Sequence, residues 1–249
     1  MVNDDRVDFE RQKAQSIADM GKDEAMFEAS LDLIRKSDEH RYSYVWSWMG
    51  VPIIQRPADM AALQEVIFET QPDVIVETGV ARGGSVVYQA ALLQMIGKKD
   101  GLVIGVDIDI RAHNRDTIEK HVMAPHIRLI EGSSIAPETV ESVRMLIPPS
   151  AKTMVVLDSN HARDHVLAEL RAYSPLVSPG QFLIAADTIL GYFKPEQAPT
   201  YYSQLLVKGD EPLAAVDEFL KETDAFVVDP INDKLIMSSS PGGFLRRVK

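Results

Sequence analysis

The sequence of 249 residues contains no cysteine. Its absence excludes disulfide bonds, a thiolate nucleophile, and zinc or iron–sulfur sites held by cysteine. Long apolar runs are missing too, since no window approaches the roughly eighteen uninterrupted apolar residues that a membrane span needs. We therefore expect no stable insertion into a membrane.

Positive charge is scarce, because 26 lysine and arginine residues face 37 acidic ones and the net charge is -11. This balance argues against nucleic acid as a partner, since nucleic-acid binding rests on contacts between basic side chains and phosphates. The first residues are polar and lack the apolar stretch of a secretory signal, so a cytoplasmic location is expected. A small molecule or a glycan remains the expected partner.

Strand-like and helix-like segments alternate through the middle of the chain. Short apolar runs are separated by stretches with apolar residues at helical spacing, and this alternation predicts a doubly wound, mostly parallel, Rossmann-like α/β sheet. The length fits one such domain with additions rather than two full domains. The predicted strands cover residues 73–77, 102–107, 127–130, 153–158 and 181–186, and the predicted helices cover residues 84–96, 113–121, 137–146 and 163–174.

The two ends of the chain differ from this alternating part. Residues 1–40 are polar, with apolar residues such as Leu31 and Ile34 at helical spacing, and they predict a helical extension that serves as a lid or an oligomer contact. Residues 41–249 form the predicted main domain, and a homo-oligomer is expected. After a helix at 216–221, three short segments predict antiparallel strands at the sheet edge: Phe226–Asp229, Lys234–Ser238 and Gly243–Val248.

An aromatic segment connects the extension to the alternating part. It runs from Tyr42 to Pro57, and its two prolines prevent it from forming one continuous helix. Tyr44, Trp46 and Trp48 have two interpretations. Their rings stack on a sugar, or they pack in the core.

The most informative local pattern is a glycine-rich turn after the first strand of the sheet. Val74–Val76 is an apolar run that leads to Glu77, and Gly79, Gly83 and Gly84 let the backbone turn tightly and approach a ligand. The residue two after Gly79 is alanine, and no Gly-Lys-Ser or Gly-Lys-Thr is present, so neither the dinucleotide fingerprint nor the P-loop applies. The turn therefore seats another nucleoside cofactor, or its glycines serve packing alone.

Polar residues end the next two strands, where ligands bind in open α/β sheets. Asp107 follows the second strand and can accept both hydroxyl hydrogens of a ribose, although a solvated loop acid is the alternative. Ser133 and Ser134 follow the third strand and are suited to contact an adenine edge, unless they are simple turn residues.

The fourth and fifth strands end in the strongest candidates for chemistry. Asp158 follows the fourth strand, His161 comes three residues later, and Asp187 follows the fifth strand. Carboxylates of neighbouring strand ends can share one divalent cation, and an imidazole beside them can act as general base. A structural role is the alternative for each residue alone. Asp164 in the same segment is expected as a cap or first-turn acid of the next helix.

Together these motifs resemble those of the cephalosporin hydroxylase-like family of class I S-adenosylmethionine (SAM) dependent methyltransferases, whose relatives include rhamnosyl and macrolide-sugar O-methyltransferases. The resemblance runs from about Tyr42 to the end and is carried by Trp48–Asp59, Ile75–Ser85, Leu157–His161 and Gly242–Val248. It implies a SAM site with the following cofactor contacts: Glu77, Gly79, Arg82, Gly83, Ser85, Asp107 for the ribose, Ser133 and Ser134 for the adenine, and Asp158.

One position departs from the metal-dependent sugar methyltransferases of this family. The resemblance implies Asp158 and Asp187 as metal ligands and His161 and Asp158 as catalytic residues, but Ala186 stands where a ligating Glu is expected. Alanine cannot bind a metal, although Mg²⁺ can be held by few carboxylates plus waters. Two interpretations stay open: a weak Mg²⁺ site completed by the sugar diol, or metal-free catalysis by His161 with an aspartate orienting it.

The resemblance implies a SAM-dependent O-methyltransferase that methylates a sugar hydroxyl of a glycan, a lipopolysaccharide precursor or a glycosylated metabolite. The alternative is a non-catalytic SAM- or nucleotide-binding accessory protein with a degraded metal site. Hydroxylation by an iron- and 2-oxoglutarate-dependent route is disfavoured, because none of the six histidines has Asp or Glu two positions on.

Overall fold

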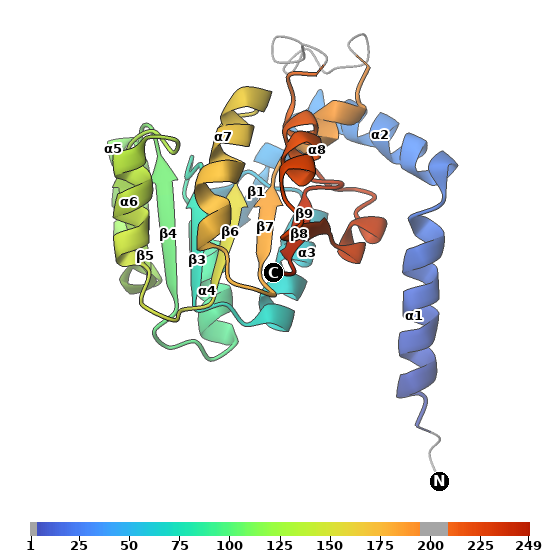
Figure 1. Cartoon of the computed structure of the whole chain (residues 1–249), viewed down its shortest axis with the longest axis horizontal. Helices are drawn as coiled ribbons and strands as arrows, with labels where there is room; N and C mark the ends of the chain where they lie inside the picture. Colours follow the sequence, from blue (N-terminus) through green and yellow to red (C-terminus); the bar gives the residue numbers. More distant parts are fainter. Residues whose placement is uncertain (1–3, 195–208) are drawn as a thin grey trace.

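A seven-stranded sheet forms the centre of the protein (Figure 1), in a computed structural model that describes residues 4–194 and 209–249. The strand order is β5-β4-β3-β6-β7-β9-β8. The first five strands in this order are parallel, and β9 pairs antiparallel with both β7 and β8. The strands are β3 (Val74–Thr78), β4 (Leu102–Asp107), β5 (Ile127–Glu131), β6 (Thr153–Leu157), β7 (Phe182–Ala185), β8 (Phe226–Val228) and β9 (Phe244–Arg247).

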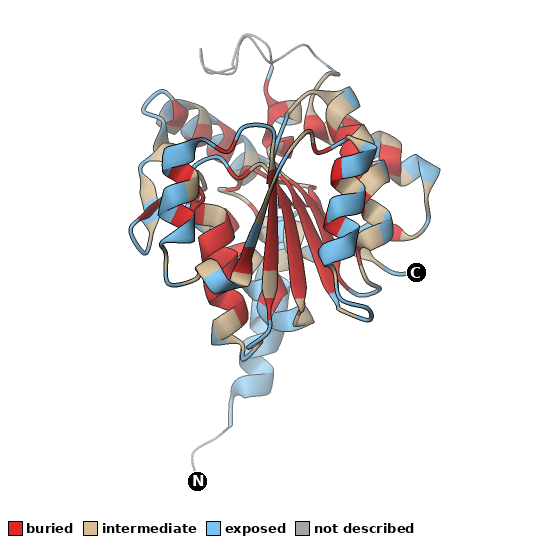
Figure 2. Cartoon of the chain, turned by 90° about the vertical axis from the view of Figure 1, so that its left-hand side faces the viewer, coloured by how far each residue is buried: buried red, intermediate tan, exposed pale blue. Residues whose placement is uncertain are grey.

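Helices cover both faces of this sheet, which confirms the predicted doubly wound fold. Alternate residues of β3 point to opposite sides: Ile75 packs with the helices of one face, and Val74 and Val76 pack with those of the other. All residues of β3, β6 and β7 are buried, as the red strands in Figure 2 show. The helices are α3 (Pro57–Thr70), α4 (Gly84–Met95) and α5 (Ala112–Glu119) on the first face, and α6 (Pro137–Leu146), α7 (Arg163–Tyr173) and α8 (Pro212–Glu222) on the second.

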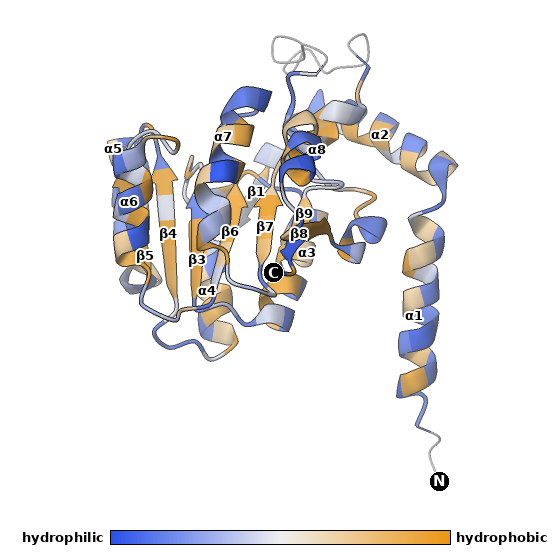
Figure 3. Cartoon of the chain, in the orientation of Figure 1, coloured by the Kyte–Doolittle hydropathy of each residue, from blue (hydrophilic) through white to orange (hydrophobic). Residues whose placement is uncertain are grey.

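Two helices precede the sheet domain, as the sequence predicts. The first, α1 (Arg6–Met20), has no buried residue and extends away from the body of the protein (Figure 1). The second, α2 (Glu24–Asp38), buries Leu31 and Ile34 against η4 (Thr188–Tyr192), the short helix that follows β7. Figure 3 shows hydrophobic residues gathered on the sheet, whereas α1 is mixed in hydropathy. Among the described helices, none combines the length and the apolar character required to cross a membrane.

The aromatic segment folds as η1 (Tyr42–Tyr44) followed by a hairpin of β1 (Trp46–Trp48) and β2 (Val51–Ile53). Both tryptophans pack against the hydrophobic core, and the centroid of the Trp48 ring lies 4.8 Å from that of Tyr88. Of the two interpretations of this segment, core packing therefore holds for Trp46 and Trp48.

One predicted strand is wrong. Lys234 ends the short helix η6 (Pro230–Lys234), and the residues after it form turns instead of a strand. The physical reason is a buried carboxylate, because Asp59 accepts hydrogen bonds from the Ser238 hydroxyl and from the backbone N–H of Ser239. These bonds to a side chain far away in the sequence take the place of the ladder bonds that a strand would need.

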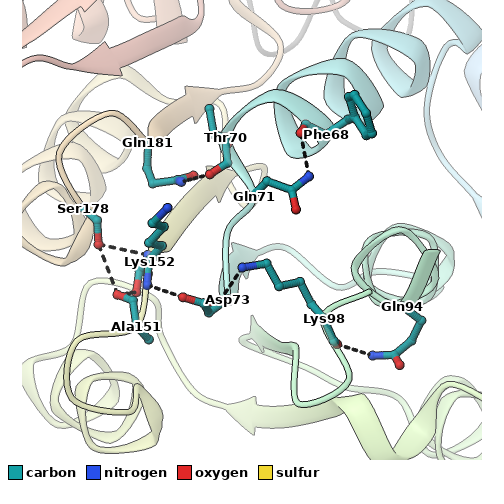
Figure 4. Close-up of polar contacts among 11 residues, drawn as sticks. Phe68, Thr70, Gln71, Asp73, Gln94, Lys98, Ala151, Lys152, Ser178 and Gln181 are labelled. Atoms are coloured by element: carbon teal, nitrogen blue, oxygen red, sulfur yellow. Dashed lines mark hydrogen bonds and ion pairs between the residues drawn. The ribbon is translucent and has the colours of Figure 1, made fainter. Parts of the chain in front are cut away.

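The two ends of the parallel strands have different roles. At the edge where the parallel strands begin, Asp73 accepts hydrogen bonds from Lys98 Nζ at 2.7 Å and from the backbone N–H of Lys152 at 2.9 Å (Figure 4). Nearby, Gln181 donates to the carbonyl of Thr70 at 2.8 Å. These bonds connect neighbouring segments where the parallel strands begin. Ligands are expected at the other end of the sheet, beyond the carboxyl ends of the strands.

Candidate active site

A cleft of about 210 Å³ opens at the carboxyl ends of β3, β6 and β7. Its walls come from η1 and β2, the glycine turn after β3, the loop after β6 and the turn after β7. The cleft brings together seven of the residues predicted from the sequence: Gly79, Arg82, Gly83, Ser85, Asp158, His161 and Asp187. Tyr44 also lines it, so one aromatic residue of the segment from Tyr42 to Pro57 lies at the site.

The glycine turn requires glycine at two positions for different reasons. Gly79 has a φ of +92°, and a Cβ there would lie 1.9 Å from the carbonyl oxygen of Asp158. Gly84 is helical, but a Cβ there would lie 2.3 Å from the carbonyl oxygen of Pro52. The turn is thus packed directly against the loop after β6 and against β2.

Glu77 lies beneath this turn rather than in the cleft. Its carboxylate is buried and accepts hydrogen bonds from the Ser85 hydroxyl and from the Gln89 amide. Burial raises the pKa of Glu77 to about 7, and the nearby charge of Asp107 contributes, while the two hydrogen bonds oppose the rise. Glu77 therefore holds Ser85 and the first turns of α4 in place.

Asp107 orders the backbone of the turn. Its Oδ2 accepts hydrogen bonds from the N–H groups of Val80 at 2.9 Å and Ala81 at 3.0 Å, and its Oδ1 accepts one from Asp109 at 3.2 Å. Asp107 is not among the residues that line the 210 Å³ cleft. The sequence did not predict this role of Asp107 in the turn, and the ribose contact stays a prediction.

Ser133 and Ser134 also lie outside the cleft. Ser134 is buried, its hydroxyl lies 3.1 Å from His165 Nε2, and its carbonyl accepts a hydrogen bond from Tyr173 at 2.9 Å. The adenine contact assigned to these serines stays a prediction.

Asp158, His161 and Asp187 converge at the base of the cleft. Each of the three residues has one atom that could bind a metal, and these three atoms lie within 4.8 Å of one another. His161 Nε2 is 3.3 Å from Asp187 Oδ2. Asp158 follows β6 and Asp187 follows β7, so adjacent parallel strands deliver both carboxylates. This set combines a titratable imidazole with two oxygen ligands.

The site is strongly acidic. Burial raises the pKa of Asp158 well above its usual range, and the charges of Asp187, Glu77 and Asp59 raise it further. Gln55 Nε2 donates a hydrogen bond to Asp158 Oδ2 at 3.0 Å. A positively charged ligand in this cleft would offset the repulsion among these carboxylates.

The cleft residues that were not predicted from the sequence include Gln55, Arg56 and Ser239. The available signal was a polar pair, Gln55-Arg56, at the end of an apolar segment closed by a proline. Ser239 carried no signal, because it only follows the segment predicted as a strand, Lys234–Ser238.

The residues present fit SAM better than a dinucleotide. Asp107 already occupies the N–H groups of Val80 and Ala81, which a phosphate would need, and its negative charge repels phosphate. SAM carries a sulfonium and no phosphate. For Mg²⁺, Asp158 and Asp187 offer two carboxylates and Ala186 offers none, so waters or substrate oxygens would have to complete the coordination.

Known proteins resemble this chain over most of its length. The sequence profile of the family described as Rhamnosyl O-methyltransferase/CmcI matches residues 40–248. A rhamnosyl O-methyltransferase of Mycobacterium tuberculosis (strain H37Rv) is 30% identical over 225 residues, which cover 84% of this chain and 83% of that protein. The rhamnosyl O-methyltransferase of Mycobacterium leprae is 32% identical over 152 residues, which cover 59% of this chain and 64% of that protein.

Solved structures support the fold. The structure of CmcI with Mg and SAM has a TM-score of 0.57 at 24% identity and covers 83% of this chain and 78% of that chain. At this identity the likeness concerns the fold alone. The profile match, which spans most of the chain, and the mycobacterial relative confirm the family predicted from the motifs. This chain belongs to the rhamnosyl O-methyltransferase/CmcI family.

Proposed function

We propose that this SAM-dependent O-methyltransferase transfers its methyl group to a sugar hydroxyl of a glycan, a lipopolysaccharide precursor or a glycosylated metabolite. The observation that carries the proposal is the convergence of Asp158, His161 and Asp187 in the cleft that the glycine turn also lines. The relatives named rhamnosyl O-methyltransferase support a sugar as the acceptor.

The reaction needs a base beside the acceptor oxygen. SAM, when bound, supplies a methyl group on a sulfonium, and the acceptor oxygen must approach that carbon in line with the sulfur. His161 is the proposed base. Its Nε2 lies 3.3 Å from Asp187 Oδ2, so Asp187 orients the imidazole and Nδ1 takes the hydroxyl proton.

Asp158 and Asp187 are the residues that would hold Mg²⁺, which would supply positive charge beside the reacting hydroxyl. Gln55 fixes one oxygen of Asp158 by its hydrogen bond and keeps that carboxylate in the cleft. In the metal-free alternative, Asp158 or Asp187 orients His161, and the contact of His161 with Asp187 favours the latter.

The test is a methyl-transfer assay with isotopically labelled SAM. The purified protein is incubated with methyl and p-nitrophenyl glycosides, including rhamnosides, with and without Mg²⁺. We expect label in the methyl carbon of a new methyl ether on a former sugar hydroxyl, located by NMR of the product. Label in no glycoside, with SAM binding intact by calorimetry, contradicts the proposal.

That negative outcome would favour the second candidate, an accessory protein that binds SAM or a nucleotide without catalysis. The observation that favours it is Ala186, which leaves the acidic site without the expected third carboxylate ligand. Transfer to any sugar hydroxyl would exclude it.

A further inference from the structure

Asp187 has an unusual backbone conformation. Its φ is +54° and its ψ is 23°, in the left-handed region that residues other than glycine rarely adopt. Such a residue persists only where the surrounding structure holds it, and this need is greatest at functional sites. The contacts that hold Asp187 therefore bear on the geometry of the site.

A network of hydrogen bonds holds the residues that follow Asp187. We call it the brace, and it comprises Asp38, Arg56, Asp59, Ser239 and Pro241 with their partners Thr188 and Ile189. The N–H of Ile189 donates to the carbonyl of Ser239 at 3.0 Å, and the Thr188 hydroxyl donates to the carbonyl of Pro241 at 2.8 Å. Asp59 fixes Ser239 in turn, by accepting its N–H at 2.9 Å. The segment predicted wrongly as a strand thus leads into a support for the turn after β7.

The brace continues to the helix α2. Arg56 donates to the Ser239 hydroxyl through Nη1, and its Nη2 contacts both carboxylate oxygens of Asp38, at 2.8 and 2.6 Å. The Arg56 and Asp38 side chains are 2% and 4% exposed, so this ion pair is buried. Asp38 is the last residue of α2.

Apolar contacts join the same two segments. Leu31 and Ile34 of α2 form one buried cluster with Ile189, Leu190 and Phe193. At its edge, the ring of Phe27 meets that of Tyr192 edge-on, with centroids 5.1 Å apart. The turn after Asp187 is therefore held from two sides by α2.

We propose that α2 is a positioning element of the active site, which holds Asp187 opposite His161 through the buried Asp38–Arg56–Ser239 contacts and through its apolar face. The brace follows from these contacts alone. Its consequence for turnover rests on the proposed function, because it assumes that Asp187 orients the base.

Hydrogen exchange tests the brace without reference to activity. In the full-length protein, Asp38→Asn removes the negative charge that pairs with Arg56, and the peptide covering residues 186–193 should exchange about tenfold faster. Leu31→Ala weakens the apolar side and should act in the same direction, which keeps the test valid if Asp38→Asn does not fold. The matched controls on the same helix are Asp32→Asn and Leu33→Ala, whose side chains are exposed.

Kinetics then test the consequence. We expect Asp38→Asn and Leu31→Ala to lower kcat by about 10- to 100-fold, because a small displacement of a catalytic group has effects of this size. KM for SAM should stay within about threefold, because Asp107 and the glycine turn lie outside the brace. Neither control should change either parameter.

The outcomes separate the two proposals. Unchanged exchange over residues 186–193 in both Asp38→Asn and Leu31→Ala overturns the brace. Faster exchange in a protein that transfers no methyl group supports the brace and contradicts the proposed function. Faster exchange with unchanged kcat overturns the claim that α2 positions the active site.

Discussion

Replacing Glu77 by Gln should make the protein more stable at neutral pH, and the gain should depend on pH. Burial raises the pKa of Glu77 to about 7 from a usual value of 4.5. Between these two values the folded protein keeps a proton that the unfolded chain has lost. The free energy of unfolding therefore falls as pH rises through this window.

The size of the effect follows from the two pKa values. A difference of 2.5 units corresponds to about 3 kcal/mol once the pH exceeds both. Gln has no proton to lose, and its carbonyl can still accept the Ser85 hydroxyl. The gain in unfolding free energy of Glu77→Gln over the wild type should therefore rise by about 2–3 kcal/mol between pH 5 and pH 8.

Urea unfolding of both proteins at several pH values measures this difference directly. Groups that do not interact with Glu77 contribute equally to both proteins and cancel, whereas the coupling of Glu77 to Asp107 and Asp158 is part of the measured difference. Glu10→Gln is the control, because that side chain is 67% exposed on α1 and should give a difference that does not change with pH. A difference for Glu77→Gln that stays constant, or that falls as pH rises, would refute a buried carboxylate with a raised pKa.

Two further substitutions test the turn and the metal site. Gly79→Ala should destabilise the protein by about 2–3 kcal/mol and abolish SAM binding by calorimetry, because its Cβ meets the Asp158 carbonyl oxygen at 1.9 Å. Wild-type affinity in this variant would contradict the close packing of the turn. Ala186→Glu adds a carboxylate to an acidic site, so the melting temperature should fall without Mg²⁺ and recover with it. Equal melting temperatures with and without Mg²⁺ would show that residue 186 does not face a metal site.

The fold was predictable because the relevant signals are local. Strands such as β3 and β6 are buried along their whole length, so they appear in the sequence as short continuous apolar runs. The glycine turn appears where a strand must turn into a helix. The order of the strands then brings their ends together, which is why Asp158, His161 and Asp187 could be grouped before their distances were known.

The contacts that could not be predicted link residues far apart in the sequence. Asp59 binds Ser238 across 179 positions, and this bond turns an apolar segment away from the sheet. Arg56 reaches Ser239 across 183 positions in the same way. Local periodicity carries no information about such partners. For this reason the residues that support the site were missed, while those that end its strands were found.

The central claim is that His161 is the base of a sugar O-methyltransferase, and one comparison tests it most directly. His161→Ala and the exposed control His40→Ala are assayed for SAM affinity by calorimetry and for methyl transfer to a glycoside that the wild type methylates. We predict that His161→Ala binds SAM normally but turns over about 10²- to 10⁴-fold more slowly, while His40→Ala matches the wild type. Wild-type turnover in His161→Ala would contradict the claim.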